Sequence, residues 1–230
     1  KYHGRVLLTL TGVCAVNCRY CFRRHFPYQD NNPGSKGWQG VLEYIRDDSS
    51  IKEVILSGGD PLLASNSLLV SLMSELALIP HLRTVRFHTR IPVVLPERID
   101  EGFLSLLAAV PLRKVIVLHV NHAQELDDQV KQVCDALRQA GCVLLCQSVL
   151  LKGINDCVET LIDLSEKLFE WGILPYYLHV LDKVAGAAHF DLPTEIAITL
   201  HQALQARLPG YLVPRLAREE AGKKSKTLLF

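Results

Sequence analysis

Short runs of apolar, often β-branched residues alternate with longer amphipathic stretches from residue 5 to residue 208. Six of these runs are apolar at consecutive positions, which is the pattern of parallel strands covered by helices. They are Arg5–Thr11, Lys52–Ser57, Arg83–His88, Lys114–Val120, Cys142–Leu150 and Leu174–Val180. The pattern therefore predicts an α/β fold built on a parallel sheet.

The stretches between these runs predict helices. In Ser67–Ile79 and Gln124–Ala140, apolar residues recur every three or four positions, which places them on one side of a helix. Similar patterns predict helices at Gly37–Arg46, Glu101–Ala109, Val158–Trp171 and Thr194–Leu208. Asp60-Pro61 has the form of an N-cap followed by proline at the first helical position.

The six βα units follow one another directly, so we expect right-handed crossovers between parallel strands. Six units are too few for a closed eight-stranded barrel. A curved open barrel and a doubly wound sheet both satisfy the pattern, and in either one the functional groups lie in loops after the carboxyl ends of the strands. The pattern stops after residue 208, so we expect a core at 1–208 and a separate segment at 209–230.

The composition is that of an ordinary globular domain, with 230 residues of which 49% are hydrophobic and 21% charged. A net charge of +1 gives no reason to expect nucleic acid as a partner. We expect no membrane span, because the longest apolar run is short and is broken by Gln147 and Ser148. Seven unevenly spread cysteines favour a reducing, cytoplasmic compartment. Because the chain begins at Lys1 rather than Met, we expect an N-terminal region before residue 1.

Three cysteines stand out because they follow the first predicted strand directly. Cys14, Cys18 and Cys21 are spaced by four and three residues, so their thiolates can surround one soft metal centre. Three buried cysteines, a zinc knuckle and a redox pair are the alternatives. Zinc favours a fourth ligand at similar spacing, and a redox pair has no use for Cys14.

Two further features lie in predicted strands or directly after them. Ser57-Gly58-Gly59-Asp60 follows the second strand, and paired glycines allow a backbone to approach a ligand closely. The same sequence also suits a plain strand–helix turn. His119 and Gln147 are polar residues in otherwise apolar strands, so each needs a hydrogen-bond partner from the backbone or from a ligand.

Cys-x3-Cys-x2-Cys with Tyr20 before its last cysteine resembles the signature of radical S-adenosylmethionine (SAM) enzymes. The resemblance implies a partial (β/α)6 barrel and a [4Fe–4S] cluster held by Cys14, Cys18 and Cys21. It also implies that SAM completes the cluster and is cleaved reductively, with electrons from an external donor. By the same resemblance, Ser57, Gly58, Gly59 and Asp60 would contact SAM, and so would His119 and Gln147.

A closer resemblance, to the lysine 2,3-aminomutases, covers essentially the whole chain. It is carried by residues 14–26, 57–62, 88–99, 121–122, 147–156, 175–177, 186–190 and 225–227. The tail at 212–219 resembles the bacterial branch that makes (R)-β-lysine for modifying elongation factor P. The resemblance implies an isomerase of L-lysine that uses pyridoxal 5′-phosphate (PLP), assembles as a homo-oligomer, and folds its tail over the active site.

The resemblance also implies roles for residues at both ends of the chain. Lys226 matches the lysine that forms a Schiff base with PLP, with Lys223 and Lys224 as rival positions. By composition alone, Lys226 is one more solvated lysine of a basic tail. Lys1, Tyr2 and Arg5 match the family's grip on the PLP phosphate, with Lys1 in place of an arginine, and Arg90 would add a further phosphate contact. The alternatives are a charged edge before the first strand and a surface loop arginine.

Three charged residues match the family's substrate-binding positions. Arg23 would bind the α-carboxylate of lysine, and Asp182 and Glu219 would bind its distal ammonium. Glu219 replaces an aspartate of the family, which changes the reach by one methylene. An ordinary surface ion pair is the alternative for each residue. An aminomutase of another amino acid and a non-catalytic metal-binding module are the alternative functions; an acidic substrate would need cations in place of Asp182 and Glu219.

Overall fold

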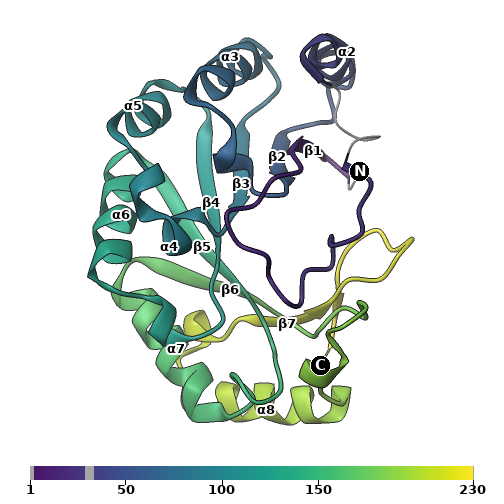
Figure 1. The fold of residues 1–230 in the computed structure, drawn as a ribbon, viewed down its shortest axis with the longest axis vertical. Helices are drawn as coiled ribbons and strands as arrows, with labels where there is room; N and C mark the ends of the chain where they lie inside the picture. The colour runs from purple at the N-terminus through teal and green to yellow at the C-terminus, as the bar shows by residue number, and fades with distance from the viewer. Residues whose placement is uncertain (1–2, 29–33, 230) are drawn as a thin grey trace. The chain divides into compact units, whose positions relative to one another are not determined.

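The computed structural model describes residues 3–28 and 34–229 and the side chains of all of these except 34–37. Figure 1 shows the elements in chain order. The strands are β1 (Arg5–Thr11), β2 (Glu53–Gly58), β3 (Thr84–Thr89), β4 (Arg113–His119), β5 (Cys142–Val149), β6 (Ile173–His179), β7 (Arg215–Arg218) and β8 (Thr227–Leu228). The helices are α2 (Gly34–Asp47), α3 (Asn66–Ala77), α4 (Ile91–Val94), α5 (Glu101–Ala109), α6 (Asp128–Gln139), α7 (Val158–Glu170) and α8 (Thr194–Arg207).

The strands follow one another in the sheet in chain order, from β1 to β8. A doubly wound sheet reverses its strand order part-way, whereas a (β/α) barrel does not. The order therefore confirms the predicted α/β fold and favours the partial barrel over the doubly wound sheet. The six predicted strands and six predicted helices are all present, with ends shifted by a few residues.

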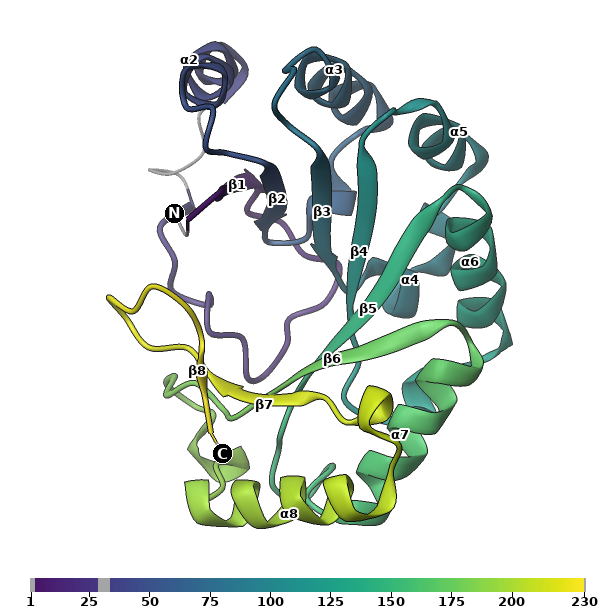
Figure 2. The ribbon, with the colours of Figure 1, turned by 180° about the vertical axis from the view of Figure 1, so that it is seen from behind.

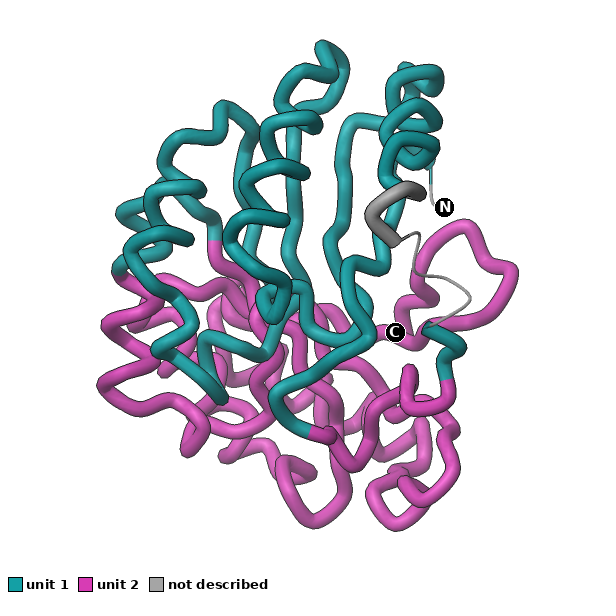
Figure 3. The backbone as a smooth tube through the Cα atoms, turned by 45° about the horizontal axis from the view of Figure 1, so that its top comes forward, with its two compact units in different colours: residues 1–16, 26–117, 136–143 teal, residues 17–25, 118–135, 144–230 magenta. Residues whose placement is uncertain are grey.

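The chain divides into two compact units, which Figure 3 distinguishes by colour. The first unit comprises residues 1–16, 26–117 and 136–143, and the second comprises residues 17–25, 118–135 and 144–230. Each unit is described separately below.

In the first unit, β1 pairs in parallel with β2, and β2 pairs in parallel with β3. Helices α3 and α5 lie side by side in Figures 1 and 2. Phe87 of β3 and Phe103 of α5 meet edge to face in the core, with ring centroids 6.1 Å apart. The predicted N-cap is confirmed, because the Asp60 side chain accepts a hydrogen bond from the Leu62 amide at the start of the short 3₁₀ helix Pro61–Leu63.

In the second unit, β6 lies between β5 and β7 and is parallel to both. Strand β8 runs antiparallel to β7. Helices α7 and α8 pack on these strands through a core of leucines that includes Leu161, Leu178, Leu204 and Leu216. The apolar pattern did not predict β7 and β8. Residues 209–230 thus extend the sheet by two short strands.

The expectation that the strands are covered on both faces is wrong for three of them. Leu7 of β1, Val143 of β5 and Leu174 of β6 are 42%, 53% and 41% exposed. Side chains alternate between the two faces of a strand, and in β5 buried residues alternate with exposed or half-buried ones. Strand β2, in contrast, is buried at five consecutive positions, as predicted.

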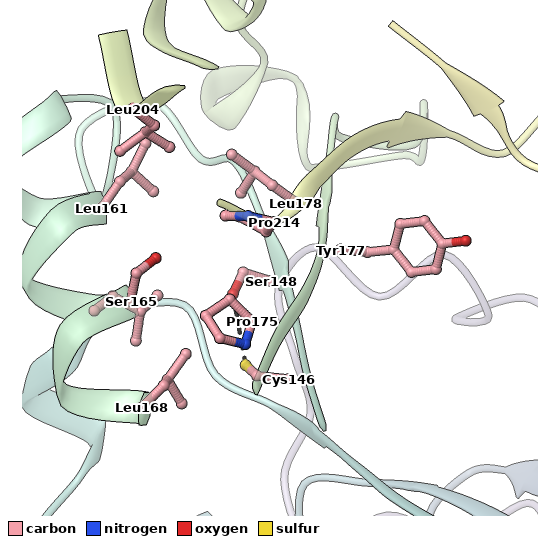
Figure 4. Close-up of a pocket in the computed structure, with 11 residues that line it drawn as sticks. Cys146, Ser148, Leu161, Ser165, Leu168, Pro175, Tyr177, Leu178, Leu204 and Pro214 are labelled. Carbon is pink, nitrogen blue, oxygen red and sulfur yellow. Dashed lines mark hydrogen bonds between the residues drawn. The ribbon is translucent and has the colours of Figure 1, made fainter. Parts of the chain in front are cut away.

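A small cavity lies on the helix-covered face of β5 and β6. It holds about 10 Å³, room for roughly one water molecule. Its wall includes Cys146, Ser148, Leu161 and Ser165, and Figure 4 shows that the Tyr177 ring points away from these side chains. The cavity is thus a packing gap in the core, and the ring of Tyr177 belongs to the other face of β6.

None of the helices described here is long and apolar enough to cross a bilayer.

Candidate active site

The three cysteines of the motif lie in the loop after β1 and form no disulfide. Cys14 belongs to the first unit and is exposed, whereas Cys18 and Cys21 belong to the second unit and are half-buried. The Cys21 amide donates to the Cys18 carbonyl at 3.1 Å, which closes a turn between them. Among residues 3–28 and 34–229, no three His, Cys, Asp or Glu side chains are gathered in a metal-binding arrangement. Thiols outside disulfides, on one accessible loop, are nevertheless a suitable donor set for an iron–sulfur cluster.

Two arginines connect the part of this loop in the second unit, residues 17–25, to the segment that follows β6. Arg24 donates from Nη1 to the Ala185 carbonyl at 2.9 Å and from Nη2 to the Arg19 carbonyl at 2.8 Å. Arg19 Nη2 lies 3.0 Å from His189 Nε2. The guanidinium of Arg19 also lies over the Phe190 ring, 5.0 Å from its centroid. Sequence reasoning assigned no role to Arg19, Arg24 or His189.

In the first unit, the glycine turn packs against the backbone that carries Cys14. The Gly59 amide donates to the Thr11 carbonyl at 2.7 Å, and the Asp60 amide donates to the Val13 carbonyl at 2.8 Å. A Cβ atom at Gly59 would lie only 2.3 Å from the Val13 carbonyl oxygen. The glycines therefore allow a close approach of two chain segments, and their contact with SAM stays a prediction.

Asp60 joins this turn to the end of β3. Its buried carboxylate accepts from Thr89 Oγ1 at 2.7 Å and from the Arg90 amide at 2.7 Å. Burial raises the pKa of Asp60, and the hydrogen bonds from Arg90, Thr89 and Leu62 oppose that rise. The position of Arg90, a predicted phosphate contact, is thus tied to the glycine turn.

The second unit brings together three predicted site residues, Lys226, Glu219 and Asp182. Glu219 directly follows β7 and Lys226 directly precedes β8, so the antiparallel pairing of these strands places the two residues opposite each other. Lys226 Nζ donates to Glu219 Oε2 at 2.5 Å. Lys226 also lies over the ring of Tyr177 on β6, 5.5 Å from its centroid.

Burial, together with the charges of Lys226 and Glu219, shifts the pKa values of Asp182 and of His179, the last residue of β6. Burial raises the pKa of Asp182; the Glu219 carboxylate raises it further and the Lys226 ammonium opposes this. Burial, with the charge of Lys226, lowers the pKa of His179 to about 3, so His179 is neutral at pH 7. Lys223, Lys224 and Lys183 are exposed, whereas Lys226 is half-buried.

The other predicted residues are dispersed among the elements. Arg23 lies with its guanidinium 5.1 Å from the Phe22 ring centroid. His119 is half-buried at the end of β4, and its Nε2 lies 2.9 Å from the Tyr20 hydroxyl. Gln147 is half-buried in β5, Ser57 is buried in β2, and Arg5 is half-buried at the start of β1. Lys1 and Tyr2 lie outside the described residues.

Sequence reasoning missed Tyr177 and His179, which frame Lys226 on β6. The available signal was the run Pro175–His179, in which aromatic and polar residues replace the aliphatic residues of the other strands.

A model of the radical SAM superfamily matches residues 8–165 of the chain. The chain is 52% identical over 228 residues to the L-lysine 2,3-aminomutase of Haemophilus influenzae, covering 99% of this chain and 68% of that protein. The chain belongs to the lysine 2,3-aminomutase family of the radical SAM superfamily. The corresponding Escherichia coli protein is 49% identical, with 100% of this chain and 67% of that protein covered. The L-lysine 2,3-aminomutase of Clostridium subterminale is 36% identical, with 99% of this chain and 55% of that protein covered.

Solved structures are similar in fold. A Streptococcus suis SuiB structure with bound S-adenosylmethionine has a TM-score of 0.67 at 16% identity, covering 96% of this chain and 51% of that chain. A radical SAM methyltransferase from Sphaerobacter thermophilus has a TM-score of 0.59 at 17% identity, covering 94% of this chain and 67% of that chain. This member of the lysine 2,3-aminomutase family therefore has the radical SAM fold. The chain spans about two thirds of the length of the Haemophilus influenzae and Escherichia coli proteins and about half of the SuiB chain.

Proposed function

We propose that the chain converts L-lysine to β-lysine by moving the amino group from Cα to Cβ. The observation that carries this proposal is the group Lys226, Glu219 and Asp182 in the second unit, where the candidate PLP lysine is paired with one candidate ammonium-binding carboxylate and acts electrostatically on the other. The names of its relatives support the same reaction.

Three groups that the structure does not contain would take part. Cys14, Cys18 and Cys21 would hold a [4Fe–4S] cluster. Lys226 would bind PLP covalently, with Lys1, Tyr2, Arg5 and Arg90 at its phosphate. SAM would lie at the cluster, near Ser57, Gly58, Gly59, Asp60, His119 and Gln147. When bound, the reduced cluster and SAM supply the radical that starts the reaction, and PLP supplies the π system through which nitrogen moves.

The charges in the second unit determine which substrate fits. Two carboxylates favour a cationic side chain and repel an acidic one, so they favour lysine over glutamate. A bound ammonium would also stabilise the ionised form of Asp182, whose pKa burial and Glu219 raise. Arg23 would bind the α-carboxylate of the same substrate, since a guanidinium fork matches a carboxylate.

We also propose, from the resemblance of the tail, that the product is (R)-β-lysine and that it serves the modification of elongation factor P. An external donor would reduce the cluster, in the cytoplasm, and the protein would act as a homo-oligomer.

Anaerobic incubation with L-lysine, SAM, PLP and a chemical reductant tests the reaction. We expect β-lysine, identified by chiral chromatography, and none from a Cys18→Ala variant. If the protein cleaves SAM but forms no β-lysine from L-lysine, the proposed substrate is wrong. If it binds zinc and does not cleave SAM, the proposed class of enzyme is wrong.

A further inference from the structure

The ammonium of Lys226 is held by two groups, and the proposed function uses only one of them. Lys226 Nζ donates to Glu219 Oε2 at 2.5 Å and also lies over the ring of Tyr177, 5.5 Å from its centroid. The face of an aromatic ring is negative and attracts an ammonium at this distance. Tyr177 therefore contributes to the place where this chain holds a cation, and it has no role so far.

The ring of Tyr177 lies on the face of β6 that the helices do not cover, since it points away from the core cavity in Figure 4. The pairing of the strands places Tyr177 between Gln147 of β5 and Arg215 of β7. The rings of Tyr176 and His179 lie next to it along β6, with centroids 4.1 Å and 5.3 Å away. These neighbours restrict the ring on several sides, so its position does not depend on Lys226 alone.

The place that the Lys226 ammonium occupies is accessible and surrounded by negative charge. The side chains of Lys226 and Glu219 are 26% and 41% exposed. Burial raises the pKa of Asp182, the charge of Glu219 raises it further, and the charge of Lys226 opposes the rise. Asp182 therefore lies within electrostatic range of both. Without the Lys226 ammonium the two carboxylates repel each other, and a second ammonium would relieve this repulsion.

The side chain of Lys226 is chemically the same as the side chain of free L-lysine. The contacts that hold its ammonium in the cofactor-free chain therefore show how this chain can hold the ammonium of a substrate. Glu219 supplies a charged hydrogen-bond acceptor, and Tyr177 supplies an uncharged face that attracts a cation. Together they favour an ammonium over a neutral or an anionic group of the same size.

We propose that Tyr177 is a specificity-determining residue that binds the distal ammonium of L-lysine on the face of its ring, next to Glu219 and Asp182. That the cation belongs to the substrate rests on the proposed function. That Tyr177 and Glu219 form a site for an alkylammonium does not, and it can be tested without PLP, SAM or a cluster.

Rescue of a cofactor-free variant tests the ammonium site. Lys226→Ala removes three methylenes and the ammonium, and n-propylammonium replaces these atoms. Proton NMR should show saturable binding, with the methylene next to the nitrogen shifted upfield by the ring. Adding Tyr177→Leu should weaken binding about fivefold, as expected for the loss of one cation–π contact. Tyr177→Phe, which keeps the ring, should bind as before, and 1-propanol, the neutral analogue, should not bind.

Tyr211→Leu in the same Lys226→Ala background is the matched control, because Tyr211 is exposed and packs on Phe169. Absence of n-propylammonium binding, or equal affinities in the Tyr177→Leu and Tyr211→Leu variants, overturns the proposal.

A second measurement needs no loss of the Lys226 side chain for its result. In cofactor-free protein labelled at lysine, the ε-methylene protons of Lys226, assigned by their absence from Lys226→Arg, should lie upfield of those of the other lysines. The shift should disappear in Tyr177→Leu and remain in Tyr177→Phe. An ordinary shift in the unaltered protein overturns the proposal.

Kinetics of the PLP-loaded, reconstituted protein test the link to the substrate. Tyr177→Leu should raise KM for L-lysine about fivefold with a smaller change in kcat, and Tyr177→Phe should restore KM. An unchanged KM in Tyr177→Leu overturns the role of Tyr177 in substrate binding. Binding of n-propylammonium as expected, with no β-lysine formed by the unaltered protein, would instead contradict the proposed function.

Discussion

Lys226 and Glu219 form an ion pair of 2.5 Å at the base of the loop that connects β7 and β8. The pair places the candidate PLP lysine against one of the two carboxylates that would receive the substrate ammonium. In the protein without cofactor, the ammonium of Lys226 thus occupies a position proposed for the ammonium of the substrate. If Lys226 held PLP covalently, its nitrogen would no longer be the ammonium that pairs with Glu219, and Glu219 and Asp182 would be available to lysine.

Removing the charge of Asp182 should impair lysine turnover selectively. For Asp182→Asn we expect kcat/KM for lysine to fall on the order of a hundredfold, since an ammonium left unpaired in a partly buried site costs a few kcal/mol. Binding of SAM should be unchanged. Asp191→Asn is the matched control, because Asp191 is exposed in the same connection between β6 and α8. Unchanged turnover by Asp182→Asn would rule out an ammonium-binding role.

The cluster assignment predicts about four irons per chain after anaerobic reconstitution. Changing Cys14, Cys18 or Cys21 to alanine should abolish both iron binding and the formation of 5′-deoxyadenosine from SAM. Cys134→Ala is the control, because Cys134 is fully buried and distant in sequence from the motif. Normal formation of 5′-deoxyadenosine by Cys18→Ala would show that the three cysteines are not the ligands.

The close approach at Gly59 predicts that any side chain there displaces the loop of Cys14. A Cβ atom would lie 2.3 Å from the Val13 carbonyl oxygen, which is backbone and cannot swing away. Gly59→Ala should therefore lower both thermal stability and iron binding. Gly40→Ala is the control, since a Cβ in helix α2 meets nothing within 4 Å and alanine favours a helix over glycine by up to about 1 kcal/mol. Equal iron binding by the two variants would contradict the tight contact.

The lowered pKa of His179 predicts acid sensitivity. The folded chain keeps His179 neutral down to about pH 3, whereas the unfolded chain binds a proton near pH 6.5. The unfolded state therefore binds more protons between these values, and stability falls as the pH falls through this window. We expect His179 to contribute a loss of about 1 kcal/mol per pH unit below 6.5.

Urea unfolding at pH 7 and pH 5 measures this effect. His179→Gln should show a smaller difference between the two pH values than the unaltered protein, and His25→Gln, in which an exposed histidine is replaced, should not. An equal difference in all three proteins would show that His179 is not held neutral by the fold.

The sequence predicted the parallel α/β core well because each βα unit carries its own local signal. The ends of β1 and α5 agree with the predicted ends, and the N-cap at Asp60 was readable from Asp60-Pro61. Strands β7 and β8 were missed because they are short, and because pairing with a neighbouring strand (β7 with β6, and β8 with β7) rather than local apolar pattern makes them strands.

The site was predictable only where a motif or a family resemblance marked it. Cys14, Cys18 and Cys21 have a spacing that limits the chemistry, and Lys226 was identified from resemblance alone. Tyr177, Arg19 and Arg24 contribute through contacts with residues far away in the chain, such as Lys226 and Ala185. No local pattern contains such contacts, and the same holds for the contacts of Tyr20 with Asn121 and His119.

The central claim is that Lys226 holds PLP beside the carboxylates that select lysine. Reduction of the PLP-loaded protein with borohydride, followed by proteolysis and mass spectrometry, tests it most directly. We expect the pyridoxyl label on Lys226, and none in Lys226→Arg, while Lys224→Arg, which removes a neighbouring exposed lysine, should be labelled as before. Label on Lys223, Lys224 or Lys183, or no label at all, would contradict the account.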